Sequence, residues 1–185
     1  PVGVSGGVSR TAVMAHRGAR LVARENTVEA FRMAAQMASD AVELDVRRTA
    51  DGVLVVHHDC LLPDGRMIAL IAHAELPEHV PTLAAALDAC EGMWVNVEIK
   101  NDPADPDFDE SESIADETTA HLIARDDDDR WLVSCFRMET IDRCHALAPN
   151  IRTAWLCEAA PAGTADLLVR NNIRAAGPIV ITETN

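Results

Sequence analysis

Short apolar runs alternate with amphipathic stretches along most of the chain. The runs typical of strands cover residues 13–15, 42–46, 53–59, 94–100, 131–136, 151–157 and 178–182. Apolar positions spaced three to four residues apart predict helices over residues 28–38, 83–90, 114–125, 138–148 and 164–172. Strands that alternate with helices favour a parallel α/β architecture.

The second and third strand-type runs are separated only by residues 47–52, which are too few for a helical crossover. The connection is therefore predicted to be a hairpin, and Asp51-Gly52 is a strong turn dipeptide within it. A turn centred between Ala50 and Asp51 places His58 opposite Glu43. A slip of one or two residues would still return a histidine to this strand.

Glu43 and Asp45 share one face of the predicted strand, because side chains two residues apart point to the same side. Neighbouring carboxylates repel each other, and a hard divalent cation between them removes that repulsion. A histidine beside them is a candidate for proton transfer, because its reference pKa of about 6.5 lies close to neutrality. In a regular strand His57 points away from His58 and is interpreted as structural. The alternative is an edge strand with two solvated acids.

Polar side chains also stand near the ends of other predicted strands. The set is His16, Glu43, Asp45, Glu98 and Lys100. A barrel gathers the carboxyl ends of its strands around one mouth, where such residues can meet. An open doubly wound sheet would also bind at strand ends, but it usually has a glycine-rich phosphate loop, which Gly18 alone does not make. The pattern favours a TIM-type (β/α)8 barrel.

The composition indicates one domain over residues 1–185, with a flexible segment at 1–12 and a short insertion at 60–80. A net charge of −14 disfavours nucleic acid or an anionic membrane as a partner. No apolar run is long enough to span a membrane. The five cysteines are scattered without C-x-x-C spacing, which indicates reduced thiols in a cytoplasmic protein. Residue 1 is not Met, so a removed leader stays an alternative.

Each candidate also has a structural interpretation. His16 would cap a loop, Arg17 would be a surface cation, and Glu98 with Lys100 would form an ion pair on an exposed strand. The acidic run Asp126–Asp129 is interpreted as a solvated turn rather than as a metal site. These alternatives apply to each motif taken alone.

Taken together, the motifs form a recognisable series. In chain order they are His16-Arg17-Gly18, Glu25-Asn26-Thr27, Glu43-x-Asp45, His58-Asp59 and Glu98-x-Lys100. In this order and spacing the chain resembles the glycerophosphodiester phosphodiesterase family. Pro81-Thr82-Leu83 and Ser134-Cys135-Phe136 are similar to two further motifs of that family, and the resemblance runs from about Val13 to Cys157.

The resemblance implies a TIM-type barrel that hydrolyses a small-molecule glycerophosphodiester to glycerol 3-phosphate and an alcohol, with one Mg²⁺ or Ca²⁺ ion. By match to the family motifs, the metal ligands would be Glu43, Asp45 and Glu98. His16 and His58 would be the acid/base pair, and Arg17 and Lys100 would face the phosphate. Neither the alcohol nor the oligomeric state follows from the sequence.

The chain departs from the family in its C-terminal part. A full barrel of this type has about 250 residues, and the W-T-x-N strand usual in the family is not found. Either the barrel is reduced, or a flexible stretch after about Glu158 is absent; we expect the second, because an unclosed barrel exposes strand edges. Two other functions stay open: a phospholipase D-like lyase related to sphingomyelinase D, which makes a cyclic phosphate, and a non-catalytic ligand-binding barrel.

Overall fold

The fold is seen in a computed structural model, which describes residues 11–157. Its strands are β1 (Met14–His16), β2 (Ala41–Arg48), β3 (Leu54–Val56), β4 (Trp94–Ile99), β5 (Trp131–Cys135) and β6 (Arg152–Trp155). Its α-helices are α1 (Val28–Gln36), α2 (Leu83–Ala89), α3 (Ser113–Ile123) and α4 (Met138–Leu147). These elements confirm the predicted ones within a few residues at each end. The helix and strand expected at 164–172 and 178–182 lie outside the described residues.

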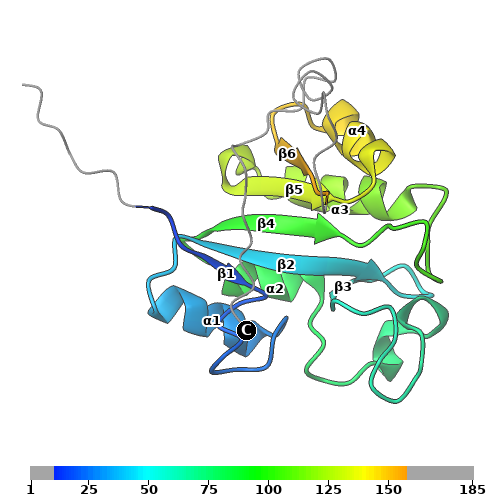
Figure 1. The fold of residues 1–185 in the computed structure, drawn as a ribbon, viewed down its shortest axis with the longest axis horizontal. Helices are drawn as coiled ribbons and strands as arrows, with labels where there is room; N and C mark the ends of the chain where they lie inside the picture. Colours follow the sequence, from blue (N-terminus) through cyan, green and yellow to red (C-terminus); the bar gives the residue numbers. More distant parts are fainter. Residues whose placement is uncertain (1–10, 158–185) are drawn as a thin grey trace, which may run out of the picture.

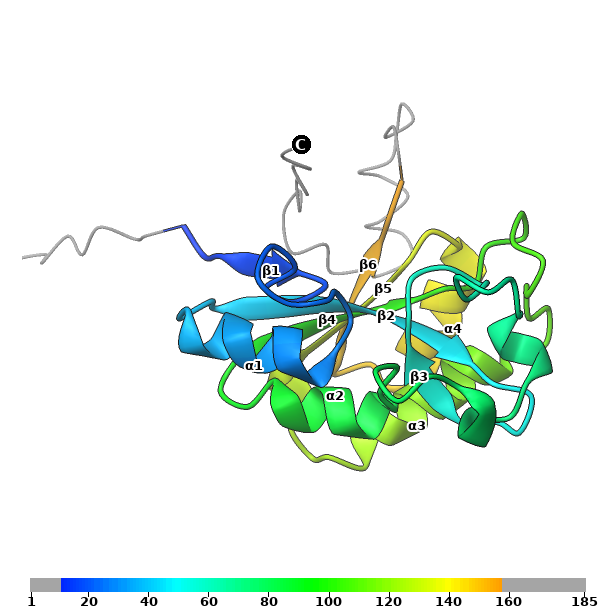
Figure 2. The ribbon, with the colours of Figure 1, turned by 90° about the horizontal axis from the view of Figure 1, so that it is seen from below.

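Within the described residues the sheet has the order β1-β2-β4-β5-β6, and all of these neighbours pair in parallel. Strand order therefore follows chain order, and a helix precedes β2, β4, β5 and β6. All four helices lie on one side of the sheet (Figures 1 and 2). Sequential parallel strands with every helix outside are the arrangement of a TIM-type barrel. The described part contributes five of its eight parallel strands.

The two faces of the sheet differ in chemistry. Val42, Leu44 and Val46 of β2 belong to the buried cluster that packs against the helices, together with Val95 and Val97 of β4. The opposite face of the same strands carries polar side chains. Parallel partners lie side by side and point the same way, so the pairing of β2 with β4 lines up their polar residues on the inner face of the barrel.

Two helices begin where their capping residues predict. Thr27 accepts a hydrogen bond from the backbone N–H of Ala30, and Thr82 accepts one from the backbone N–H of Ala85. These side chains satisfy backbone donors that the first helical turn leaves without partners. The loop before each helix therefore ends at a defined residue, which helps fix the barrel mouth around the strand ends.

The β2–β3 hairpin is present, and its register is shifted by one residue from the predicted centre, within the slip that the sequence allowed. Val46 pairs with Val56, and the His57 backbone N–H donates to the carbonyl of Asp45, so His58 does not lie opposite Glu43. The turn is centred on Asp51, because Gly52 adopts φ +81° and makes the loop one residue longer than predicted.

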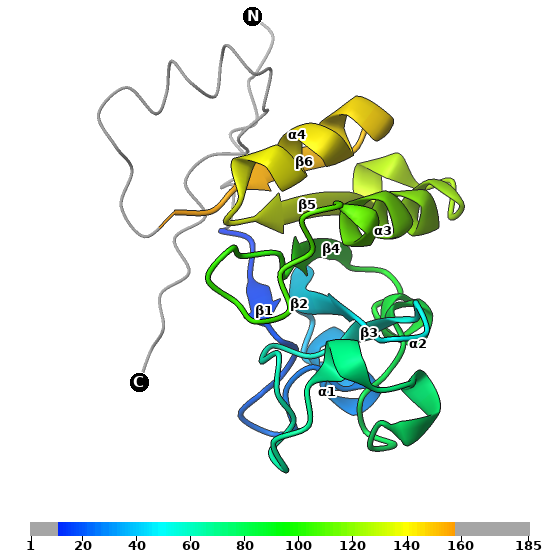
Figure 3. The same ribbon diagram turned by 90° about the vertical axis from the view of Figure 1, so that its right-hand side faces the viewer.

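Figure 3 looks onto the carboxyl ends of the parallel strands. The loop between β4 and α3 and the segment that follows β3 both border this end. None of the helices in residues 11–157 is long and apolar enough to cross a bilayer.

Candidate active site

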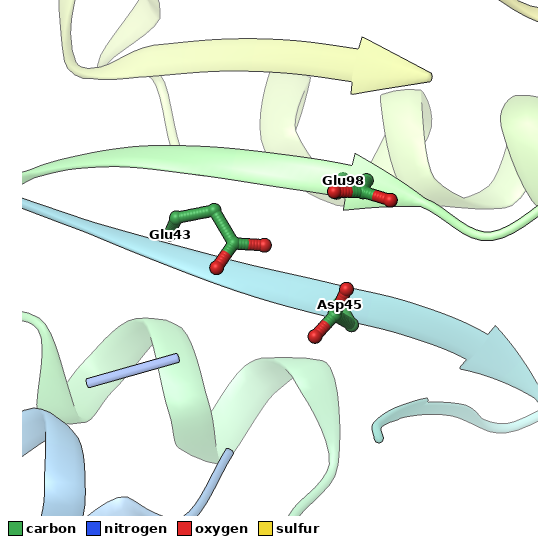
Figure 4. Close-up of side chains that lie close together, drawn as sticks. All are labelled: Glu43, Asp45 and Glu98. Carbon is green, nitrogen blue, oxygen red and sulfur yellow. The ribbon is translucent and has the colours of Figure 1, made fainter. Parts of the chain in front are cut away.

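Three carboxylates meet on the inner face of the sheet, near the strand ends. Glu43 and Asp45 come from β2, and Glu98 comes from β4, where it is the direct partner of Asp45. One carboxylate oxygen from each residue lies within 4.8 Å of the others, and all three residues are buried. Figure 4 shows the three side chains grouped over the two strands. The structure therefore brings together the three residues predicted to bind a metal ion.

Glu43 is the most deeply placed of the three, with none of its surface exposed. The backbone N–H of Arg17 donates to Oε2 over 3.0 Å, whereas Oε1 has no hydrogen-bond partner among the described residues. Burial raises the pKa of Glu43 well above its usual value, and the charges of Asp45 and Glu98 raise it further. A carboxylate in this position gains stability when a positive charge comes close to it.

Lys100 supplies positive charge to the other two acids. Its Nζ lies 3.1 Å from Oδ1 of Asp45 and 2.5 Å from Oε1 of Glu98. Burial alone would raise the pKa of Asp45, but Lys100 and a 2.7 Å hydrogen bond from Asn26 help bring it below the usual value. Burial also raises the pKa of Glu98, and Lys100 offsets only part of this effect.

The donor set fits a hard divalent cation. Such ions bind carboxylate oxygens, and two oxygens of the cluster already converge on the cationic Nζ of Lys100. Oε1 of Glu43 is buried without a hydrogen-bond partner, which is expensive for an ionised oxygen unless a cation or a donor approaches it. Among the described residues, no other group of three potential ligand side chains comes this close together, the acidic run Asp126–Asp129 included.

The two predicted acid/base histidines flank this cluster. His16 ends β1, and its Nε2 lies 3.6 Å from Oε2 of Glu43. His58 follows β3, and its Nδ1 lies 2.7 Å from Oδ1 of Asp59. Because Asp59 engages Nδ1, Nε2 is the nitrogen of His58 that is left for proton exchange with a ligand.

The loop after β1 is shaped by a close contact with α1. Gly18 adopts φ +81°, and a Cβ atom there would lie 2.8 Å from the backbone of Ala30. Arg17 also has a positive φ, of 57°, and its guanidinium lies 3.1 Å from Oε1 of Glu25 and 3.3 Å from Oδ2 of Asp45. This conformation holds Arg17 and His16 against the carboxylate cluster.

A cavity of about 930 Å³ opens beside these groups. Of the predicted site residues, His58, Glu98 and Lys100 line it, whereas His16, Arg17, Glu43 and Asp45 are not among its lining residues. Its walls include Leu62, Val80 and Phe136 as well as the polar groups Arg24, His57 and His79. His57 and His58 both line this cavity, because β3 ends at Val56 and the alternation of a strand no longer applies to them.

Arg47 joins the two segments that border the cavity. Its Nε donates to the carbonyl of His58 over 2.8 Å, and its other nitrogens form ion pairs with Asp105 and Asp107. Arg47 is almost fully buried on the inner face of β2, two residues beyond Asp45. It therefore ties the backbone of a predicted catalytic histidine to the loop after β4.

The structure adds two polar residues to the surroundings of the acids that the sequence did not predict there. Asn26, which the sequence placed only within the Glu25-Asn26-Thr27 motif, adopts φ 55° and donates from Nδ2 to Oδ2 of Asp45 over 2.7 Å. Asn96 pairs with Glu43 across β2 and β4 and is completely buried. Asn96 stands two residues before Glu98, so both side chains lie on the same face of β4. This two-residue spacing is the signal in the sequence that could have placed Asn96 near the acids.

Comparison with known proteins gives a consistent result. The model of the glycerophosphoryl diester phosphodiesterase family matches residues 16–181. A glycerophosphodiester phosphodiesterase of Caldanaerobacter subterraneus is 50% identical over 50 residues, which are 27% of this chain and 21% of that protein. One from Bacillus subtilis is 27% identical over 178 residues, covering 81% of this chain and 60% of the relative. The chain thus spans less than two thirds of the length of these curated relatives.

Solved structures agree with this assignment. A phosphodiesterase of Oleispira antarctica, solved in complex with the product sn-glycerol-3-phosphate, superposes with a TM-score of 0.73 at 27% identity. The match covers 88% of this chain and 72% of that one. With the family model matching most of its length, this chain belongs to the glycerophosphoryl diester phosphodiesterase family.

Proposed function

We propose that the chain hydrolyses glycerophosphodiesters to glycerol 3-phosphate and an alcohol, with a divalent cation, Mg²⁺ or Ca²⁺, held by Glu43, Asp45 and Glu98. The observation that carries this proposal is the meeting of three buried carboxylates beside an imidazole and a cavity. Membership of the family supports it, as does the product named for the Oleispira structure. A bound cation would neutralise the charge of the phosphodiester and polarise it toward attack.

The two histidines would move the protons. One unprotonated imidazole would take a proton from the neighbouring glycerol hydroxyl as that hydroxyl attacks phosphorus, and the other, protonated, would give one to the oxygen of the leaving alcohol. Water would then open the resulting cyclic phosphate to give glycerol 3-phosphate, with the two histidines exchanging these roles. Each transfer contributes roughly 10²–10⁴ in rate. His16 is held against Glu43, and Asp59 fixes the ring of His58, so both imidazoles have a defined orientation.

Lys100 and Arg17 would stabilise the negative charge on the non-bridging phosphate oxygens. Lys100 lines the cavity and is the better placed of the two. Its pKa is raised despite burial, because Asp45 and Glu98 lie beside it, so its amine stays protonated at neutral pH. These cations also give an anionic substrate a local positive centre in a chain of net charge −14.

The test is phosphorus NMR of glycerophosphocholine incubated with the full chain and Mg²⁺, Ca²⁺ or Mn²⁺. We expect the diester signal to give way to that of glycerol 3-phosphate, and EDTA to stop the conversion. A final product that is a cyclic phosphate would indicate the lyase alternative. Binding of the diester without turnover under any of the three ions would indicate a non-catalytic barrel.

The matched variants are His58→Gln and His145→Gln. His58 lines the cavity, whereas His145 lies on α4 and is not among its lining residues. Turnover should fall with the first substitution and stay unchanged with the second. Equal effects of the two would contradict the role given to His58.

A further inference from the structure

Asn96 is a buried polar residue that the proposed chemistry does not use. Its side chain is completely excluded from solvent, and neither Oδ1 nor Nδ2 has a hydrogen-bond partner among the described residues. An amide left unpaired in a protein interior costs about 1–3 kcal/mol for each unsatisfied group. Buried polar groups of native proteins are almost always paired, so Asn96 calls for an explanation.

The strand pairing places Asn96 next to a second unsatisfied group. Asn96 is the direct partner of Glu43 in the parallel pair of β2 and β4. Strands in a sheet lie about 4.8 Å apart and parallel partners point to the same face, so both side chains stand side by side on the inner face. The neighbour of Asn96 on its other flank is Leu132 of β5, which offers no hydrogen bond.

The unsatisfied atoms are chemically complementary. Oε1 of Glu43 is an acceptor without a donor, and Nδ2 of Asn96 is a donor without an acceptor. The same site already contains one such pair, in which Nδ2 of Asn26 donates to Oδ2 of Asp45 over 2.7 Å. Each of the two carboxylates on β2 thus has an asparagine beside it, contributed by a different element.

We propose that Asn96 is a positioning residue for Glu43: when a divalent cation is bound, its Nδ2 donates a hydrogen bond to Oε1, directly or through one buried water, and so holds the carboxylate in the orientation that binds the ion. The inference rests on the proposed function insofar as that function places a cation here. Hydrogen-bond partners behind metal ligands fix ligand orientation, and removing one lowers metal affinity by about 10–100-fold.

The test compares Mn²⁺ binding by isothermal titration calorimetry with melting temperatures in EDTA, using the full chain. Asn96→Leu keeps the approximate volume and removes the amide. We expect its Mn²⁺ affinity to fall about 10–100-fold. Its melting temperature in EDTA should stay at or above that of the wild type, because in the ion-free chain the amide of Asn96 is buried without a partner and the substitution removes it.

The matched control is Thr118→Val on α3. Thr118 is also completely buried, and its hydroxyl has no hydrogen-bond partner in the described part of the chain, but it lies on a helix outside the site. Its Mn²⁺ affinity should match that of the wild type. If Asn96→Leu does not fold, Asn96→Ser and Asn96→Ala replace it, and the serine variant, which keeps a donor, should bind Mn²⁺ more tightly than the alanine variant.

Three outcomes overturn the inference. The first is an Asn96→Leu variant with unchanged Mn²⁺ affinity, and the second is equal affinity of the serine and alanine variants. The third is a wild-type chain that binds no Mn²⁺ at all. The inference and the proposed hydrolysis can also fail separately. If the wild type binds Mn²⁺ but turns over no diester, and Asn96→Leu binds Mn²⁺ more weakly, the role of Asn96 is supported and the proposed hydrolysis is refuted.

Discussion

Replacing Glu43 with Gln tests the electrostatics of the carboxylate cluster. The substitution keeps the shape of the side chain and removes one of three charges whose oxygens lie within 4.8 Å. At that separation and an effective dielectric constant of about 20, two like charges repel by about 3.5 kcal/mol. Lys100 and Arg17 offset part of this repulsion, and the raised pKa of Glu43 lets the carboxyl bind a proton instead.

We therefore expect Glu43→Gln to be more stable than the wild type in EDTA at pH 7.5, by about 1–2 kcal/mol. For a chain of this size that corresponds to a rise in melting temperature of about 2–8 °C. The stabilisation by Mg²⁺, in contrast, should be smaller in Glu43→Gln than in the wild type. An ion at about 100 times its Kd stabilises the wild type by about 2.7 kcal/mol, and the variant, which lacks one charged ligand, should gain much less.

The assay is thermal unfolding followed by circular dichroism, with and without Mg²⁺. Glu117→Gln serves as the control, because Glu117 forms a partly exposed ion pair with Arg48 over 2.7 Å. Losing that pair should lower stability by about 0–1 kcal/mol and leave the response to Mg²⁺ unchanged. A Glu43→Gln variant that is less stable than the wild type in EDTA, or that responds fully to Mg²⁺, would refute the reasoning.

Four further predictions concern catalysis, pH, the loop after β1 and the thiols. His58→Ala should lower kcat by about 10²–10⁴ with little change in KM, and an unchanged kcat would remove this residue from the mechanism. The pKa of Glu43 in the folded chain is raised above its usual value of 4.5, so the ion-free folded chain holds this proton more tightly than the unfolded chain does. The folded chain therefore loses stability as the pH rises above 4.5. The stability advantage of Glu43→Gln in urea titrations should thus be larger at pH 7 than at pH 4.5; an equal difference at the two pH values contradicts this. Gly18→Ala should lose about 1–3 kcal/mol in urea denaturation, because φ there is +81° and a Cβ would meet Ala30; an unchanged midpoint would mean that the loop can rearrange. Burial raises the pKa of Cys90 to about 12, so mass spectrometry after native iodoacetamide treatment at pH 8 should find Cys90 unmodified and the exposed Cys157 alkylated; modification of both would contradict the packing.

Much of the fold could be predicted because its local signals agree with its tertiary contacts. Apolar runs became the strands whose outer face packs on helices, and Thr27 and Thr82 cap the helices that follow them. Glu98 could be expected beside the acidic pair because parallel strands end at the same edge of a barrel. The register of β2 with β4 then places it directly next to Asp45.

Other features depend on conformations that a residue pattern does not specify. The hairpin register changed by one residue because Gly52 adopts a positive φ, and His57 turned toward the cavity because β3 ends before it. Asn96 could be assigned to a polar face from its spacing, but only the pairing of two distant strands shows that it adjoins Glu43. The residue pattern within one strand does not show which residues of a neighbouring strand lie beside it.

The central claim is that the three buried carboxylates bind one divalent cation. Titration of the full chain with Mn²⁺, followed by electron paramagnetic resonance of the free ion, tests it most directly. We predict one tight site per chain, weakened strongly in each of the variants Glu43→Gln, Asp45→Asn and Glu98→Gln. Binding that stays at wild-type affinity in any one of these three variants would contradict the account.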